Sequence, residues 1–370
     1  MDIKRRLTIY VIYSKGGIEK YIGVALSELK KFSYKLIVIC NFPQILYGEE
    51  NINKFADEVI LRENIGYDAG AYKDIFQDLY KRGEIYDFDD VLLVNDSWYG
   101  PFWSLENMFN TMDSRKDVDF WSMTKHPEGD IDGIKFLEHC QSFFINFNKR
   151  VINSIVFKKF WEQLAYPKSM NNAIIDFEIG INERLTNCGF RGLSYLDVMA
   201  PDRVYNRNES PYLYDTFFLV SEARIPIIKW KALLFGSPFI EAMRTLEYVR
   251  DNTEYDVSLI EDSIVKKNEE NCRYDWDKLA RFVDQFDEIY LYGAGKWGNY
   301  MSAYFKYKGW KIAGFVQSER GLNAFALDEI SISKKTGFIV TVKDREAGAA
   351  IKNNVLKRAN AEQIFLPNYE

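Results

Sequence analysis

Residues 91–101 read VLLVNDSWYGP, and this stretch decides the fold expected of the chain. Four apolar residues lead directly into Asn95, Asp96 and Ser97, and a Gly-Pro pair follows two residues later. In open α/β sheets, ligands bind just beyond the carboxyl ends of strands. Oxygen-bearing side chains at such an end suit a divalent metal or a sugar. The stretch therefore predicts a strand at 91–95 that ends in a ligand site.

Strands and helices alternate through the first hundred residues. Short apolar runs predict strands at 7–13, 35–41, 58–64 and 91–95. Helical spacing of apolar residues predicts helices at 19–32 and 70–82. This βαβ alternation predicts an α/β fold with a mostly parallel sheet and helices on both faces.

The pattern loosens beyond residue 119 and restarts near the end of the chain. Strands are expected at 119–125 and 141–148, around a polar loop at 126–133, with helices at 151–164, 176–188 and 241–267. The polar run 266–273 is typical of a linker. Further strands are expected at 288–295, 311–316, 337–342 and 363–367, with helices at 297–308 and 345–358. We expect a larger α/β domain over 1–240, a helical connector over 241–272 and a smaller Rossmann-like domain over 273–370.

Composition and charge exclude several classes of protein. The chain has 370 residues, 47% of them hydrophobic and 28% charged, which is typical of a globular protein with two domains. A net charge of −6 argues against nucleic acid as the main partner. Two histidines are too few for a multi-histidine metal cage. No apolar run approaches the roughly 18 residues of a membrane span.

The cysteines and the N-terminus indicate the compartment. Four widely spaced cysteines form no Cys-x-x-Cys pair, so we expect free thiols in a reducing environment. The first apolar run, 7–13, is too short for a signal sequence and is broken by Ser14–Gly17. We therefore expect a cytoplasmic protein, with peripheral contact at the inner face of the membrane left open.

A glycine-bearing turn follows the expected strand 58–64. Asn64 ends that strand, Gly66 allows a close backbone approach, and Asp68 and Lys73 lie near the start of the next helix. A helix N-terminus favours a diphosphate, which makes these four residues candidates for donor binding. Plain helix capping by Asp68 explains the same residues equally well.

Asn95, Asp96 and Ser97 are candidates for donor binding, with Asp96 as the candidate metal ligand. A polar turn after a strand is the simpler interpretation of three such residues on their own. Two features favour a ligand site: the strand is adjacent to the 64–73 turn, and a Gly-Pro pair fixes the exit of the loop.

The segment 176–190 is the candidate for the catalytic helix. Its spacing places Glu178, Ile181 and Leu185 on one side, and Gly189 ends it. Glu178 would then face a cleft and act as a general base whose pKa is tuned by burial. An acidic residue in a first helical turn also stabilises the helix dipole, and this simpler interpretation stays open.

Three polar residues at the start of the expected strand 141–148 are candidates for acceptor binding. Gln141 and Ser142 offer groups that hydrogen-bond sugar hydroxyls, and His139 would bind metal or substrate. A lone histidine at a strand entry is more often structural. Trp98 would stack on a sugar face, although core packing is the commoner fate of tryptophan.

Two further motifs lie outside these groups. Lys229 and Lys231 follow Pro226 and would neutralise a diphosphate, unless they belong to a solvated loop. Gly293–Gly298 (GAGKWG) lies between an expected strand and helix, as in dinucleotide-binding folds. Tight strand–helix packing is enough to explain those glycines, so we expect a structural or regulatory Rossmann-like module more than an NAD site.

The chain resembles the rhamnan synthesis protein F family over roughly residues 1–240. The resemblance rests on five stretches in the same order, NIGYDAGAYK (64–73), LLVNDSWYGPF (92–102), DFWSMT (119–124), HCQSFFINF (139–147) and EIGINERLTNCGF (178–190). Members are glycosyltransferase-like proteins of bacterial surface polysaccharide assembly. A looser similarity to family 2 glycosyltransferases of GT-A fold places Glu178 at the catalytic base and Phe177 where a first acid is expected. Their Asp-x-Asp metal motif would fall at 95–97, where one carboxylate remains.

The resemblance implies a GT-A-like domain that transfers a sugar with inversion. The implied donor is a nucleotide-diphospho-sugar, dTDP-L-rhamnose being favoured, and the implied acceptor is an oligosaccharide or a lipid-linked glycan. Asp68 would contact the nucleotide, Asp96 the diphosphate or sugar, and Glu178 the acceptor hydroxyl. One carboxylate would hold Mg²⁺ or Mn²⁺ only weakly, so a metal-independent site is a real alternative.

Two other functions remain open on the sequence. The chain would be a non-catalytic glycan- or nucleotide-binding subunit of a polysaccharide assembly complex if the missing acids at Asn95 and Phe177 abolish catalysis. It would be an oxidoreductase if Gly293–Gly298 binds NAD(P).

Overall fold

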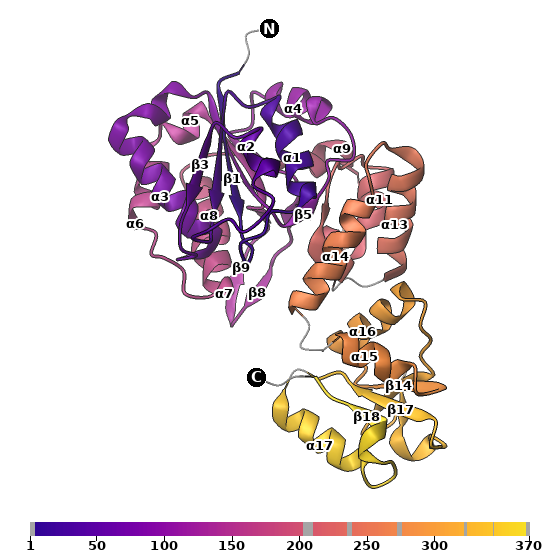
Figure 1. Cartoon of the computed structure of the whole chain (residues 1–370). Coiled ribbons are helices and arrows are strands. Elements are labelled where there is room, and N and C mark those ends of the chain that lie inside the picture. Colours follow the sequence, from indigo (N-terminus) through magenta and orange to yellow (C-terminus); the bar gives the residue numbers. More distant parts are fainter. Residues whose placement is uncertain are drawn as a thin grey trace. The chain divides into compact units, whose positions relative to one another are not determined.

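The computed structural model describes residues 4–202, 210–234, 239–271, 276–321, 324–342 and 344–367. The chain divides into two compact units, Met1–Glu261 and Asp262–Glu370 (Figure 1). The expected domain boundary near residue 272 lies outside the described residues.

The first unit is built on a mostly parallel sheet. Within the described residues its seven strands run in the order β12-β6-β11-β4-β1-β2-β3. Their bounds are β1 Arg6–Ile12, β2 Lys35–Cys40, β3 Glu58–Leu61, β4 Asp90–Asn95, β6 Phe120–Ser122, β11 Phe144–Asn148 and β12 Gly192–Ser194. β11 alone among these strands runs antiparallel to both of its neighbours, β4 and β6. The expected α/β fold with helices flanking a mostly parallel sheet is confirmed.

Helices cover both faces of this sheet (Figure 1). Apolar residues of α3, α6 and α8 share one core with alternate residues of β1 and β4, among them Ile9 and Leu93. On the other face, Phe109 of α4 contacts Phe144 of β11. The longer helices of the unit are α1 Lys20–Lys30, α3 Tyr67–Arg82, α4 Glu106–Asp113, α6 Ile155–Gln163, α8 Gly180–Asn187 and α13 Phe239–Asn252, and α14 Ser258–Asn271 begins in this unit and continues into the second.

Short elements connect these layers. The short helices are α2 Glu50–Asn53, η1 Glu84–Asp87, α5 Lys149–Ile152, α7 Met170–Ala173, the π-helix η2 Ile174–Ile179, α9 Tyr195–Met199, α10 Pro211–Tyr214, α11 Thr216–Ser221 and α12 Trp230–Leu234. The short strands are β5 Trp98–Tyr99, β7 Lys125–His126, β8 Gly129–Ile131, β9 Ile134–Phe136, β10 His139–Cys140 and β13 Ile228–Lys229.

Three expected helices differ from the structure, and the polar loop expected at 126–133 contains β8 and the end of β7. The helix expected at 151–164 is split, because Ser154 caps a new helix by accepting a hydrogen bond from the Phe157 backbone. The helix expected at 176–188 starts earlier with the wide turn η2 and becomes α8 at Gly180, although Gly189 ends it in the left-handed conformation as expected. The helix expected at 241–267 is two helices, α13 and α14.

The second unit has its own parallel sheet, in the order β16-β15-β14-β17-β18 among the residues described. Its elements are α15 Trp276–Val283, β14 Glu288–Tyr292, α16 Lys296–Tyr307, β15 Gly314–Gln317, β16 Phe325–Ala326, η3 Leu327–Glu329, β17 Thr336–Val340, α17 Arg345–Val355, η4 Ala361–Gln363 and β18 Ile364–Phe365. A Cβ atom on Gly298 would lie 1.8 Å from the Gly293 carbonyl oxygen, so close strand–helix packing accounts for a glycine there.

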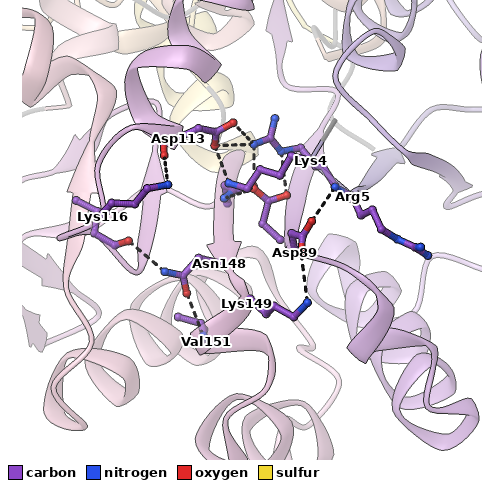
Figure 2. Close-up of polar contacts among 12 residues, drawn as sticks. Lys4, Arg5, Asp89, Asp113, Lys116, Asn148, Lys149 and Val151 are labelled. Carbon is purple, nitrogen blue, oxygen red and sulfur yellow. Dashed lines mark hydrogen bonds and ion pairs between the residues drawn. The ribbon is translucent and has the colours of Figure 1, made fainter. Parts of the chain in front are cut away.

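A buried ion pair joins the amino ends of β1 and β4. Arg6 and Asp90 face each other in the strand register, and the Arg6 guanidinium donates Nε–H and Nη2–H to the two carboxylate oxygens at 3.0 and 2.9 Å. Arg6 Nη2 also donates to Asp113 at 2.8 Å. Lys4, which is partly exposed, forms a second ion pair with Asp90. Beside it, Asp89 accepts hydrogen bonds from the Arg5 backbone N–H and from the Lys149 ammonium (Figure 2).

Replacing Arg6 tests how much this pair stabilises the sheet. Arg6→Met leaves the Asp90 carboxylate buried without its guanidinium, so we expect the free energy of unfolding to fall by roughly 3 kcal/mol in urea titrations. Arg115→Gln is the control, because it breaks an exposed pair with Asp117 and is expected to change stability far less. Equal effects of the two substitutions would contradict this account.

Candidate functional site

The antiparallel strand β11 brings two polar segments to one edge of the sheet. The Phe143 carbonyl accepts a hydrogen bond from the Asn95 backbone N–H at 3.1 Å, immediately where β4 ends and β11 begins. Residues 139–142, which precede β11, therefore lie beside 95–97, which follow β4. The sequence places these segments over forty residues apart.

The first turn of α3 reaches the same edge. Gly66 and Tyr67 both have positive φ angles, 79° and 59°, and this tight turn presents Asp68 to the end of β4. Asp68 Oδ2 accepts a hydrogen bond from Asn95 Nδ2 at 2.9 Å. Burial raises the pKa of the Asp68 carboxyl, Asn95 opposes the shift, and the negative charge of Glu178 adds to it.

Asn95 and Asp96 point to different partners. The Asn95 side-chain oxygen accepts hydrogen bonds from the Ser97 backbone N–H at 3.2 Å and from Ser97 Oγ at 2.6 Å. Asp96 Oδ2 instead accepts from the Tyr13 backbone N–H at 3.1 Å, just beyond the end of β1. Asn95 therefore connects the strand end to α3, and Asp96 connects it to β1.

Glu178 is held by the segment before β11. Its Oε2 accepts hydrogen bonds from the Ser142 backbone N–H at 2.7 Å and from Ser142 Oγ at 2.5 Å. Its Oε1 lies 3.3 Å from Nε2 of His139. Burial opposes ionisation of Glu178, but His139, Lys229 and Ser142 together lower its pKa to about 2. It lies in the π-helical turn η2, a rare geometry that is frequent at functional sites.

His139 is the imidazole partner of Glu178. Its Nδ1 lies 2.9 Å from the Leu137 carbonyl oxygen, which can only accept, so Nδ1 carries a proton. Its Nε2 faces the Glu178 carboxylate at 3.3 Å, and this contact favours a second proton on that nitrogen. Burial lowers the pKa of His139, but the hydrogen bond and charge of Glu178 outweigh it and the net pKa is raised.

Lys229 enters the site from a distant part of the chain. β13 pairs with β5 so that Lys229 lies opposite Trp98, and the Trp230 backbone N–H donates to the Ser97 carbonyl at 3.1 Å. The Lys229 ammonium lies 4.3 Å from the centre of the Phe143 ring. Burial and the charge of Lys231 lower the pKa of Lys229 to about 8, against the opposing effect of Glu178 and Asp68.

Three expected site residues make other contacts in the structure. Trp98 is fully buried against Tyr10, which corrects the expectation that its ring stacks on a sugar. Gln141 is buried, and its side-chain oxygen accepts from Thr124 Oγ1 at 2.7 Å.

Lys73 contacts the Leu164 carbonyl and the Tyr166 ring, which joins α3 to the segment after α6. Asn64 is exposed before the α3 turn. Their binding roles stay predictions.

His126 is a residue of this site that no local sequence pattern singled out. The β7–β10 pair places His126 directly opposite His139, with the two rings stacked at 5.5 Å and 11°. Both histidines of the chain lie close to the same polar loop, which is a sign in the sequence that they could meet. Only the pairing of β7 with β10 shows that they do.

The residues of this edge do not form a ready metal centre. Within the described parts of the chain, no three His, Cys, Asp or Glu side chains are grouped as metal ligands. Asp96 brings one carboxylate, one oxygen of which accepts from Tyr13. A single carboxylate with one oxygen already engaged does not fit a tightly held metal.

Comparison with known proteins identifies the family. A model described as rhamnan synthesis protein F matches residues 36–293, well over half of the chain. The chain belongs to the rhamnan synthesis protein F family. The resemblance recognised in the sequence is thereby confirmed, and the family name connects the chain with the synthesis of a polysaccharide.

Two relatives match a little over half of the chain. The uncharacterised protein y4gN of Sinorhizobium fredii is 26% identical over 206 residues, 54% of this chain and 49% of that protein. Virulence protein VirA of Vibrio anguillarum is 27% identical over 223 residues, 59% of this chain and 66% of that protein. The matched region is thus about half of the first relative and just under two thirds of the second.

Solved structures give weaker likenesses. The 4-diphosphocytidyl-2C-methyl-D-erythritol synthase of Anaerococcus prevotii is 11% identical with a TM-score of 0.34, covering 52% of this chain and 88% of the other. A cytidylyltransferase of Leptospira borgpetersenii is 12% identical with a TM-score of 0.31, covering 68% of this chain and 99% of the other.

Among the described residues, no helix has the length and apolar character to cross a bilayer.

Titration of the two histidines tests the charge arrangement. Because the chain has only two, each imidazole is resolvable by NMR. We expect His139 to titrate above its ordinary pKa of 6.5 and His126 below it. Glu178→Gln removes the carboxylate, so the pKa of His139 should fall.

Glu183→Gln is the matched control on the next helix, and it should shift the pKa of His139 less. Two histidines that titrate together, unmoved by Glu178→Gln, would contradict the ion pair.

Proposed function

We propose that this edge of the sheet transfers a sugar, with inversion, from a nucleotide-diphospho-sugar to a glycan acceptor. The observation that carries the proposal is the convergence of Asp68, Glu178 and Lys229 from three separate elements. Asp68 bonds to Asn95 at the end of β4, Glu178 bonds to Ser142 just before β11, and Lys229 lies opposite Trp98 just after β4. Family membership supports an L-rhamnosyl or similar deoxysugar donor, with dTDP-rhamnose favoured.

Lys229 and α3 form the donor side in this proposal. The anomeric carbon loses its bond to the diphosphate, whose oxygen leaves with the electron pair. A lysine with a pKa of about 8 is mostly charged at neutral pH, and its partly desolvated ammonium offsets that negative charge effectively. The start of α3, a helix of sixteen residues, meets the end of β4 at the same edge, where its first backbone N–H groups favour a diphosphate. Asp68, Asn95 and Ser97 would orient the donor.

Glu178, Ser142 and His139 form the acceptor side. The sequence suggested Glu178 as the general base, and its position at the site supports contact with the acceptor. With a pKa of about 2, however, it is a weak proton acceptor at neutral pH. We assign it the role of holding Ser142 and His139 around the acceptor hydroxyl. A lipid-linked acceptor would bring this edge to the inner face of the membrane.

A non-catalytic subunit is the second candidate. The three hydrogen bonds on Glu178 suit a structural carboxylate as well as a substrate-binding one. Such a subunit would bind a nucleotide sugar or glycan without turnover.

Replacing Lys229 separates these candidates. Lys229→Met should lower kcat/KM for the nucleotide sugar by about 100-fold, since the leaving group loses its cation. Lys168→Met, at an exposed lysine, is the control and should leave transfer unchanged. Release of nucleoside diphosphate is measured with a panel of nucleotide sugars and glycan acceptors, with and without Mn²⁺ or Mg²⁺. Binding without release would favour the subunit, and wild-type kcat/KM in Lys229→Met would contradict the donor site.

A further inference from the structure

The proton of the acceptor hydroxyl needs a base, and the geometry points to His126. Resting on the proposed function, we propose that His126 accepts this proton at Nε2, and that the His139–Glu178 pair is the positioning element that keeps the His126 ring neutral. The assignment rests on the tautomers of the two rings, their stacking and their exposure.

The tautomer of His126 follows from its hydrogen bond. Its Nδ1 lies 2.8 Å from the Pro127 carbonyl oxygen, which can only accept, so Nδ1 carries a proton. In the neutral ring, Nε2 then carries the lone pair. No other group in the described residues hydrogen-bonds to the His126 ring. This nitrogen is therefore available to a substrate.

The stacked neighbour disfavours a second charge. In this proposal His139 carries a proton on each nitrogen, one facing the Leu137 carbonyl and one facing Glu178, and its ring lies nearly parallel to that of His126 at 5.5 Å. Phe136 packs its ring edge-on against both, which holds the stack. Charging both rings would place two like charges in contact in a partly desolvated site.

The surrounding charges agree with one neutral ring. Burial and the positive charges of His139 and Lys229 lower the pKa of His126, against the opposing effects of the Pro127 carbonyl and Glu178. Glu178 and Glu183 instead raise the pKa of His139. The surroundings thus lower the pKa of His126 and raise that of His139. In such a pair one group stays charged while the other works as a base.

Exposure distinguishes the two rings as well. His139 is 5% exposed and enclosed, whereas His126 is partly exposed on β7. An incoming sugar hydroxyl can reach the outer ring more easily than the inner one. His139 contacts Glu178 directly and His126 stacks on His139, so both rings lie at the acceptor side of the site.

The step balances without a further reactant. The hydroxyl oxygen forms a bond to the anomeric carbon as the bond from that carbon to the diphosphate oxygen breaks. The hydroxyl proton moves to the lone pair on His126 Nε2, which becomes an imidazolium. The diphosphate leaves with the electron pair of the broken bond, and the Lys229 ammonium offsets its negative charge.

Chemical rescue of His126→Ala tests the proposal in the full-length protein. We expect kcat for transfer to fall by about 100-fold, with KM for the donor unchanged, because the base acts in the chemical step alone. Added imidazole should restore a measurable part of the lost rate in His126→Ala and none in Lys229→Met. Glu138→Gln, at an exposed neighbour of His139, is the control and should keep wild-type activity.

The pH profile is an independent test that needs no alanine variant to fold. Wild-type kcat/KM should fall as pH drops through a pKa below 6.5, where His126 becomes protonated. His139→Gln removes a positive neighbour and leaves Glu178 unbalanced, and both changes raise the pKa of His126. This acid limb should therefore move to higher pH in His139→Gln.

Two results would overturn the proposal. Full activity of His126→Ala would do so, as would a wild-type profile that is flat down to about pH 4, since a carboxylate would then be the base. If the wild-type protein transfers no sugar from any donor, the proposed function fails instead, and the two failures are distinguishable.

Discussion

The antiparallel pairing of β11 with β4 is the constraint on which the site depends. A parallel strand at that position would have carried residues 139–142 to the opposite edge of the sheet, away from Asn95. Because β11 runs the other way, the residues before it meet the residues after β4, and Glu178 can bond to Ser142 across the junction. The chemistry proposed here is a consequence of one strand direction.

The two ends of β4 carry charge in different ways. At its amino end, Asp90 and Arg6 neutralise each other in a buried, bidentate pair that fixes the register with β1. At its carboxyl end, carboxylates and cations are partly exposed and arranged so that their pKa values diverge. The first arrangement is suited to stability, whereas the second leaves groups in protonation states that a substrate can use.

Local sequence patterns were sufficient to predict much of the fold. The alternation of strands and helices, the turn before α3 and the polar end of β4 are all local, and the structure has them. The splits at Ser154 and η2 were missed because capping and a wide turn override helical spacing. Sugar stacking and core packing both stayed open for Trp98, because its place beside a polar motif gives no sign of where its ring packs, and the structure buries it. The place of His126 at the site follows from the register of β7 with β10, which no local sequence pattern predicts.

The central claim is that the carboxyl edge of the first sheet binds a nucleotide sugar. Hydrogen–deuterium exchange of the full-length chain, with and without dTDP-rhamnose and related donors, tests it most directly. We predict slower exchange at 64–73, 95–99, 139–142 and 228–231 when a donor is bound, and unchanged exchange at 293–299. Slower exchange confined to 293–299 would contradict the account and place the nucleotide in the second unit.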